Sequence, residues 1–258
     1  MKRLATALAL ILGAAYLVGW APQKLFVAGA LLVSLLCYWE FADLVAAHGI
    51  PRPGVFGLLA GLLILFVPQE TLSAVSIVLV CAFITSLRKG NLREVLPQVA
   101  CAMMGAFYAF APWRFAIDLR QASIHLLFFA LALNWVGDSA AFYVGRQFGK
   151  HRLAPVVSPG KSWEGAAASV FAAVLFGILY LGRFVPQIAW WQVAIIATVA
   201  NVAGQFGDLA ESAMKRGAGV KDSGNLLPGH GGMLDRVDSS LFALPVVYVL
   251  YRLVLAAR

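Results

Sequence analysis

Long apolar runs of helix length, uninterrupted by charge, are the feature that most restricts how this chain can fold. A helix needs about 20 such residues to cross a bilayer core of ~30 Å. The runs lack the ~10-residue alternating pattern of an outer-membrane barrel. Charged residues make up only 12% of the 258 residues, whereas soluble domains carry roughly 25%. The sequence therefore predicts an all-α integral membrane protein.

We expect about nine transmembrane helices in a single multi-pass membrane domain, residues 1–258. Prolines such as Pro112 punctuate the connections between the runs, as helix-breaking residues should. The expected spans cover residues 4–21, 25–45, 54–68, 71–87, 94–112, 122–146, 163–181, 189–212 and 239–256. Spans one to five (1–121) are poor in polar residues, so we expect catalysis in spans six to nine (122–258), with loops 146–162 and 207–238.

The distribution of Lys and Arg predicts the orientation of the spans. With nine spans, 14 basic residues fall on the side of the N-terminus and of loops 146–162 and 207–238, and 6 on the other. We therefore expect these parts in the cytoplasm, the C-terminus outside, and the protein in the cell inner membrane. The net charge of +8 also favours contact with anionic lipids of the bilayer. No soluble basic domain or recognition module indicates nucleic acid.

Segment 207–239 concentrates both signs of charge in an otherwise apolar chain, with five of the 12 acidic residues. Carboxylates bind hard cations, Lys and Arg bind phosphate oxygens, and glycines let backbone N–H groups approach them. Gly231 and Gly232 suit a nest of N–H groups around an anion. The other candidates here are Asp208, Ser212, Lys215, Arg216, Lys221, Asp222, His230, Asp235, Arg236 and Asp238. The segment predicts a site for phosphates and a divalent cation.

Polar residues also lie within the expected spans. Asn134 and Asp138 are four residues apart on one helix face, beside small residues that allow close approach. Because an intramembrane carboxylate is costly, we expect Asp138 to serve the function, the alternative being a structural pair with Arg146. In the eighth span a polar stripe should line a wet cavity at the cytoplasmic side. Its members are Asn201, Gln205, Asp208, Ser212 and Lys215.

The loop 146–162 ends in Gly-Lys-Ser, which imitates the end of a nucleotide-binding P-loop. Pro155 stands where that motif requires glycine and no strand is expected before it, so we reject a P-loop. Ser162 suits a helix N-cap and Glu164 a first-turn carboxylate, which leaves Lys161 for a phosphate contact. In the second span, Glu40 and Asp43 are interpreted as solvated carboxylates at a helix end.

Several of these blocks resemble the signature of phosphatidate cytidylyltransferases, also called CDP-diacylglycerol synthases. The principal blocks are SAMKR (212–216), KDSG (221–224) and LPGHGGMLDRVD (227–238). NWVGD (134–138), GR (145–146), SPGKS (158–162) and EG (164–165) also resemble family blocks. The resemblance is strong over residues 134–239 and extends to the whole chain in span number and length.

This resemblance implies that CTP and phosphatidate react to give CDP-diacylglycerol and diphosphate at the cytoplasmic face, in phospholipid biosynthesis. It also implies a homodimer and a paired-cation centre of Mg²⁺ with K⁺, with Asp208 and Asp235 at the ligand positions. The residues agree chemically, since joining two polyanions demands positioning and charge stabilisation more than a strong base. Asp208 and Asp235 lie at the same expected depth, so we expect them to meet around one divalent cation.

The other candidates receive supporting roles. We expect Asp138, Asp222 and Asp238 to complete or support the metal site. Phosphate binding is expected of Lys161, Lys215, Arg216, Lys221 and Arg236. CTP or cofactor binding is expected of Asn134, Ser158, Ser212, Gly231 and Gly232.

Two other functions fit part of the pattern. One is another CTP-dependent membrane lipid enzyme, with an ether-lipid or dolichol-type substrate. The other is an ion-coupled transporter, which could use Asp138 and the polar stripe of span eight as an ion path. A transporter would not require the glycine-rich segment 217–238.

Overall fold

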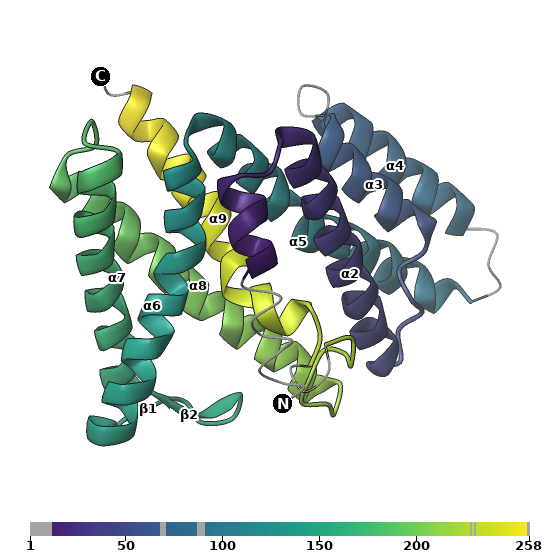
Figure 1. The fold of residues 1–258 in the computed structure, drawn as a ribbon. Helices are drawn as coiled ribbons and strands as arrows, with labels where there is room; N and C mark the ends of the chain where they lie inside the picture. The colour runs from purple at the N-terminus through teal and green to yellow at the C-terminus, as the bar shows by residue number, and fades with distance from the viewer. Residues whose placement is uncertain (1–11, 68–70, 87–90, 228, 230, 257–258) are drawn as a thin grey trace. The chain divides into compact units, whose positions relative to one another are not determined.

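The computed structural model describes residues 12–67, 71–86, 91–227, 229 and 231–256. These residues form a helical protein with one small β-hairpin (Figure 1). The chain divides into two compact units. The first unit comprises residues 1–114 and 214–236, and the second comprises 115–213 and 237–258. The expectation of a single membrane domain stays a prediction.

The first unit is built from the N-terminal helices. Residues 12–19 are helical and precede α2 (Gln23–Ala47), α3 (Val55–Phe66), α4 (Thr71–Ser86), the short 3₁₀ helix η1 (Leu92–Glu94) and α5 (Val95–Ala122). Helices α3 and α4 pack side by side (Figure 1). A buried cluster of small and branched side chains, Ala60, Ile64, Val75 and Ala106, forms part of the core of this unit.

The second unit contains most of the C-terminal helices. Its elements are α6 (Ile124–Phe148), β1 (Arg152–Ala154), β2 (Ser158–Ser162), α7 (Trp163–Phe184), and most of α8 (Trp190–Gly217) and α9 (Leu234–Ala256). Helices α6 and α7 lie along each other and are joined by the antiparallel hairpin β1–β2 (Figure 1). Gly177 permits this packing, because a Cβ atom there would lie 2.9 Å from the buried ring of Phe129.

Among the described residues, six helices are long and apolar enough to cross a membrane: α2, α5 with η1, α6, α7, α8 and α9. The predicted fold class, an all-α multi-pass membrane protein, is confirmed. Helices α3 and α4 contain 12 and 16 residues, which corresponds to lengths of only ~18 and ~24 Å. The first expected span, 4–21, lies partly outside the described residues. The number nine is therefore not confirmed.

Two expectations about the connections were wrong. Pro112 does not end a helix, since α5 continues through it to Ala122. Neighbouring side chains such as Phe110 and Ala116 are fully buried. Packing of this kind lets a membrane helix tolerate the loss of the backbone hydrogen bond that proline cannot form. No strand was expected before Gly160-Lys161-Ser162, yet residues 152–162 contain the hairpin β1–β2, with Arg152 paired to Ser162.

Candidate functional site

Two clusters of charged side chains stand out, one in each unit. We call them the Asp208 cluster (Asp138, Lys161, Asp208 and Ser212) and the Asp235 cluster (Glu40, Lys215, Ser223, Gly232 and Asp235). The first lies in the second unit and the second lies in the first unit. Each contains a lysine bonded to an aspartate.

The Asp208 cluster draws its charges from three elements. Asp208 on α8 has its Oδ2 atom 2.5 Å from Lys161 Nζ of β2, and its Oδ1 accepts a hydrogen bond of 3.3 Å from Ser212. Asp138 on α6 is exposed, and the charged groups that act on it are Asp208 and Lys161. Lys161 is the cation whose charge acts on Asp138. Two carboxylates and one ammonium group gather there.

The start of α7 and the hairpin together position Lys161. Ser162 caps α7 by accepting a hydrogen bond from the N–H of Gly165 at 3.2 Å. Glu164, in the first turn, lies 2.7 Å from His151 Nδ1 at the other end of the hairpin. Trp163 N–H donates to the His151 carbonyl at 2.9 Å. The predicted roles of Ser162 and Glu164 at this helix start are confirmed, and both hairpin ends are fixed to α7.

Beside this cluster, polar side chains join α6, α7 and α8. Asn201 on α8 accepts hydrogen bonds from Ser169 Oγ at 3.1 Å and from Gln205 at 2.8 Å, and its amide lies 3.5 Å from Asn134 Oδ1. As predicted, these residues do not face lipid. Asn134 and Asn201 are 3% and 1% exposed, so they form interhelical hydrogen bonds where a wet cavity was expected. A role of Asn134 in CTP binding stays a prediction.

The Asp235 cluster is more enclosed. Asp235, in the first turn of α9, has its Oδ1 atom 2.5 Å from Lys215 Nζ at the end of α8. Its Oδ2 atom accepts hydrogen bonds from Ser223 N–H at 2.9 Å and from Gly232 N–H at 2.8 Å. The side chains of Lys215 and Asp235 are 10% and 5% exposed. This ion pair is therefore largely removed from solvent.

The anions that face backbone N–H groups of segment 207–239 belong to the protein itself, namely the carboxylates of Asp235 and Glu40. Gly231 has φ +76°, a conformation that favours glycine, and its carbonyl accepts from Leu227 N–H at 2.9 Å. Gly232 N–H then points to Asp235. A Cβ atom on Gly232 would collide with Glu40 Oε2 and Ser223 Oγ. Substrate binding by Gly231 and Gly232 stays a prediction.

Glu40 is the residue whose sequence interpretation was wrong. The Glu40 side chain was expected to be solvated at a helix end. Instead the residue is 6% exposed and accepts hydrogen bonds from backbone N–H groups at the start of α9. Its hydrogen-bonding partners lie about 190 positions away in the sequence, namely Met233 and Leu234. No local pattern could have revealed them. Asp43, one turn further, is solvated as expected and pairs with Arg52 at 2.6 Å.

The remaining predicted residues lie around these clusters. Arg216 is exposed and bonds the Val220 carbonyl at 3.1 Å. Asp238 accepts a hydrogen bond from Ser239 N–H at 2.6 Å. Ser158 begins β2 opposite Ala154. Exposed positions are occupied by Lys221, Asp222 and Arg236. His230 lies outside the described residues.

The carboxylates of Asp208 and Asp235 differ in how accessible they are to a hard cation such as Mg²⁺. The Asp208 side chain is 29% exposed, which fits the oxygen-rich, partly hydrated coordination of Mg²⁺. The oxygens of both aspartates are already bonded, so a cation would have to replace Lys161 or Ser212 at Asp208, and Lys215 at the more enclosed Asp235. Within the described residues, no group of three or more His, Cys, Asp or Glu side chains could hold a metal ion. That Asp208 and Asp235 share a cation stays a prediction.

Comparison with known proteins decides the family. The chain matches the sequence pattern of the Cytidylyltransferase family over residues 1–254. The chain belongs to this family. It is 34% identical to a phosphatidate cytidylyltransferase of Staphylococcus saprophyticus over 85% of this chain and 86% of the relative. Identity to the enzyme of the same name from Staphylococcus haemolyticus is 33%, with 91% of both chains covered. The family match makes the protein a nucleotidyltransferase and favours an enzyme over a transporter.

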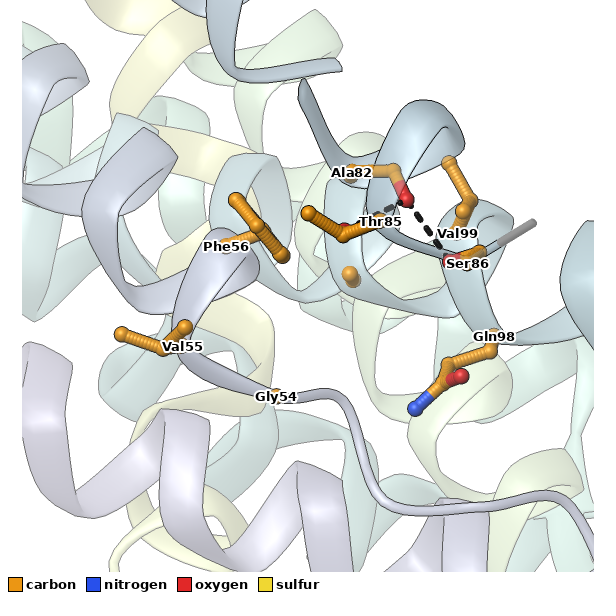
Figure 2. A pocket seen from close by; sticks show the side chains of 9 residues that line it. Gly54, Val55, Phe56, Ala82, Thr85, Ser86, Gln98 and Val99 are labelled. Atoms are coloured by element: carbon orange, nitrogen blue, oxygen red, sulfur yellow. Dashed lines mark hydrogen bonds between the residues drawn. The ribbon is translucent and has the colours of Figure 1, made fainter. Parts of the chain in front are cut away.

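One cavity of this cytidylyltransferase lies away from both clusters. It measures about 230 Å³ and lies among α3, α4 and α5 of the first unit (Figure 2). Thr85 and Ser86 line it, but their hydroxyls donate to the carbonyl of Ala82 at 3.1 and 2.7 Å. Apolar surface makes up most of the wall. The cavity brings no charged side chain to the chemistry.

Proposed function

We propose that this protein is a phosphatidate cytidylyltransferase, which converts CTP and phosphatidate to CDP-diacylglycerol and diphosphate in phospholipid biosynthesis. The observation that carries the proposal is the similarity to relatives of that name over 85% and 91% of the chain. The membrane fold supports it, because phosphatidate resides in a bilayer. The two lysine–aspartate clusters also support it, because both substrates are polyanions.

In this reaction a phosphate oxygen of the lipid forms a bond to the α-phosphorus of CTP. The bond from that phosphorus to the diphosphate group breaks, and diphosphate leaves with the electron pair. The lipid phosphate is already an anion, so the protein must chiefly overcome repulsion between substrates. We assign this task to Lys161 and Lys215, with further phosphate contacts from Arg216, Lys221 and Arg236.

We also propose Asp208 and Asp235 as ligands of Mg²⁺, with K⁺ as a second cation. Bound Mg²⁺ would stabilise the negative charge that develops on the phosphates. Asp138, which is subject to the charge of Asp208, would complete or support this cation site. Lys161 and Lys215 keep the two ligand carboxylates neutralised until a cation and substrate arrive.

The excess of Lys and Arg supports a particular placement in the membrane. We propose that the protein lies in the cell inner membrane with its N-terminus and its active site on the cytoplasmic side. The lipid tails would reach the site sideways from the bilayer. A homodimer is part of this proposal.

One assay tests the activity. Purified protein in lipid nanodiscs receives labelled CTP, Mg²⁺ and either phosphatidate, an ether-lipid analogue or dolichol phosphate. We expect labelled lipid from phosphatidate, and its loss when Mg²⁺ is chelated. Product from one of the other lipids alone would replace the proposed substrate, and no labelled lipid at all would overturn the proposal. Direct Mn²⁺ binding, followed by electron paramagnetic resonance, tests the metal independently of turnover.

A further inference from the structure

Glu40 lies in the last two turns of α2, a helix to which no functional residue has been assigned so far. Its carboxylate is buried, and the start of α9 provides the groups that stabilise its charge. Oε1 accepts a hydrogen bond of 2.8 Å from Met233 N–H, and Oε2 accepts one of 2.8 Å from Leu234 N–H. N–H groups at the start of a helix lack partners within it, so Glu40 serves as the cap of α9 from another helix.

Glu40 is also linked to Asp235 through Ser223. Ser223 Oγ lies 2.9 Å from Glu40 Oε2 and 3.0 Å from Asp235 Oδ2. One hydroxyl proton thus serves two carboxylates. The N–H of the same serine donates to Asp235 at 2.9 Å. Charged hydrogen bonds of this kind are about twice as strong as neutral ones. Glu40, Ser223 and Asp235 are therefore joined in one hydrogen-bonded group.

The end of α2 meets the other end of the segment as well. His48, which follows α2, lies so close to Gly217 that a Cβ atom on that glycine would be 2.6 Å from His48 Nε2. Gly217 ends α8, two residues after Lys215. The end of α2 thus contacts the chain just after Lys215 and just before Asp235.

We propose that Glu40 is a positioning residue of the active site: it holds Ser223 and the start of α9 so that Asp235 faces Lys215. It touches neither substrate, and it acts through Ser223 and the backbone at the start of α9. This inference rests on the proposed function, in which Lys215 binds a substrate phosphate and Asp235 binds a cation. It gives the N-terminal helices a part in catalysis that the sequence did not indicate.

The test compares Glu40→Gln with Asp43→Asn, a matched loss of one carboxylate charge on the same helix. Gln would present an amide N–H₂ to groups that are themselves donors. We expect Glu40→Gln to lower kcat about 10–100-fold, the usual effect of losing a group that orients a ligand, while the KM for CTP changes little. Asp43→Asn should keep wild-type kinetics. Hydrogen exchange of the Met233 and Leu234 amides should accelerate in Glu40→Gln only.

Ser223→Ala provides a second route if Glu40→Gln does not fold. This variant keeps the two backbone bonds to Glu40, so the Met233 and Leu234 amides should stay protected while kcat falls. The double variant should be no worse than Glu40→Gln alone. A folded Glu40→Gln protein with wild-type kcat and unchanged exchange would overturn the inference, as would a Ser223→Ala protein with wild-type kcat. Wild-type protein inactive on CTP and phosphatidate would instead overturn the proposed function, and the exchange data would still report on Glu40.

Discussion

Lys161 and Lys215 each bond an aspartate, but their surroundings differ. The Lys161–Asp208 pair is more than a quarter exposed on both sides, whereas Lys215 and Asp235 are 10% and 5% exposed. An exposed ion pair contributes about 0–1 kcal/mol, whereas breaking a buried one costs about 3–5 kcal/mol. Lys161 can therefore exchange its aspartate for a phosphate at little cost. Lys215 can do so only if something else compensates Asp235.

The first prediction concerns Lys161. Lys161→Ala should raise the KM for CTP about 10–100-fold, because a charge-assisted contact contributes about 1.5–3 kcal/mol. Lys161→Arg should retain part of the activity, since lysine acts here as a point charge. Lys150→Ala, an exposed lysine just before the hairpin, is the control and should be neutral. Steady-state kinetics for both substrates measure the effect. Unchanged kinetics in Lys161→Ala would show that Lys161 does not bind substrate and is only a structural residue of the hairpin.

The second prediction concerns Asp138. Asp138→Asn should lower turnover about 10–100-fold or more, as expected for a carboxylate that completes or supports the metal site. The variant should remain folded, because Asp138 is exposed and is not part of the buried amide network. Activity per folded molecule and thermal unfolding are measured together. A variant that unfolds early but keeps its activity per folded molecule would show that Asp138 is structural.

For single residues, the sequence predicted an interaction where the two interacting residues are close together in the chain. The cap Ser162 followed from spacing because its hydrogen bond to Gly165 is local, and Glu164 followed as a first-turn carboxylate. The pairing of Glu164 with His151, 13 residues earlier, did not follow from the sequence. Glu40 could not be interpreted in this way. Its cost of burial is offset by donors nearly 200 residues later, and only the folded chain brings them together.

At the scale of elements, two glycines of α7 offer a matched comparison. A Cβ atom on Gly177 would lie 2.9 Å from Phe129 and 3.2 Å from Val193, whereas one on Gly182 would meet no atom within 4 Å. Gly177→Ala should destabilise the protein by about 1–3 kcal/mol, because Phe129 is fully buried and cannot move aside. Gly182→Ala should be neutral or stabilising by up to about 1 kcal/mol, since alanine favours helix. Thermal unfolding in detergent measures both. Equal stabilities would contradict this packing of α7.

The elements themselves were predictable as far as apolar length defines them. Helices α6 and α7 fell close to their expected spans, since each is a continuous apolar run. The predicted fifth span ended at Pro112 because proline usually ends a helix. Helix α5 continues past Pro112, and the residues around the proline are buried. The hairpin was missed because strands of three and five residues carry too little periodicity to detect.

At the scale of the whole molecule, topology gives the fourth prediction. Nine spans require the two ends of the chain to lie on opposite sides of the membrane. A reporter fused after residue 258 should therefore report the outside, and one inserted in loop 146–162 should report the cytoplasm. The same side for both would mean that an even number of the three helices between the two reporters, α7, α8 and α9, cross the membrane.

The fifth prediction concerns Asp208 and Asp235, which come from different units. Asp208→Asn and Asp235→Asn should each remove nearly all Mg²⁺-dependent turnover. The double variant should be little worse than either single variant, because ligands of one reaction centre act as a unit. Mn²⁺ affinity should fall in parallel. Near-normal turnover in either single variant would show that the substituted aspartate is not a ligand of the metal.

The shortness of α3 has a consequence for the lipid around it. This helix exposes Val55, Leu59 and Phe66 along a length of 12 residues, or ~18 Å, while an average hydrocarbon core is ~30 Å thick. With a hydrophobic mismatch of this size, either the bilayer beside α3 becomes thinner or α3 enters only one leaflet. If α3 crosses the bilayer, the bilayer beside it must be thinner than average, and phosphate headgroups there lie closer to the membrane midplane. A lipid-modifying enzyme in such a patch meets its substrate with less of the acyl chain to withdraw from its neighbours.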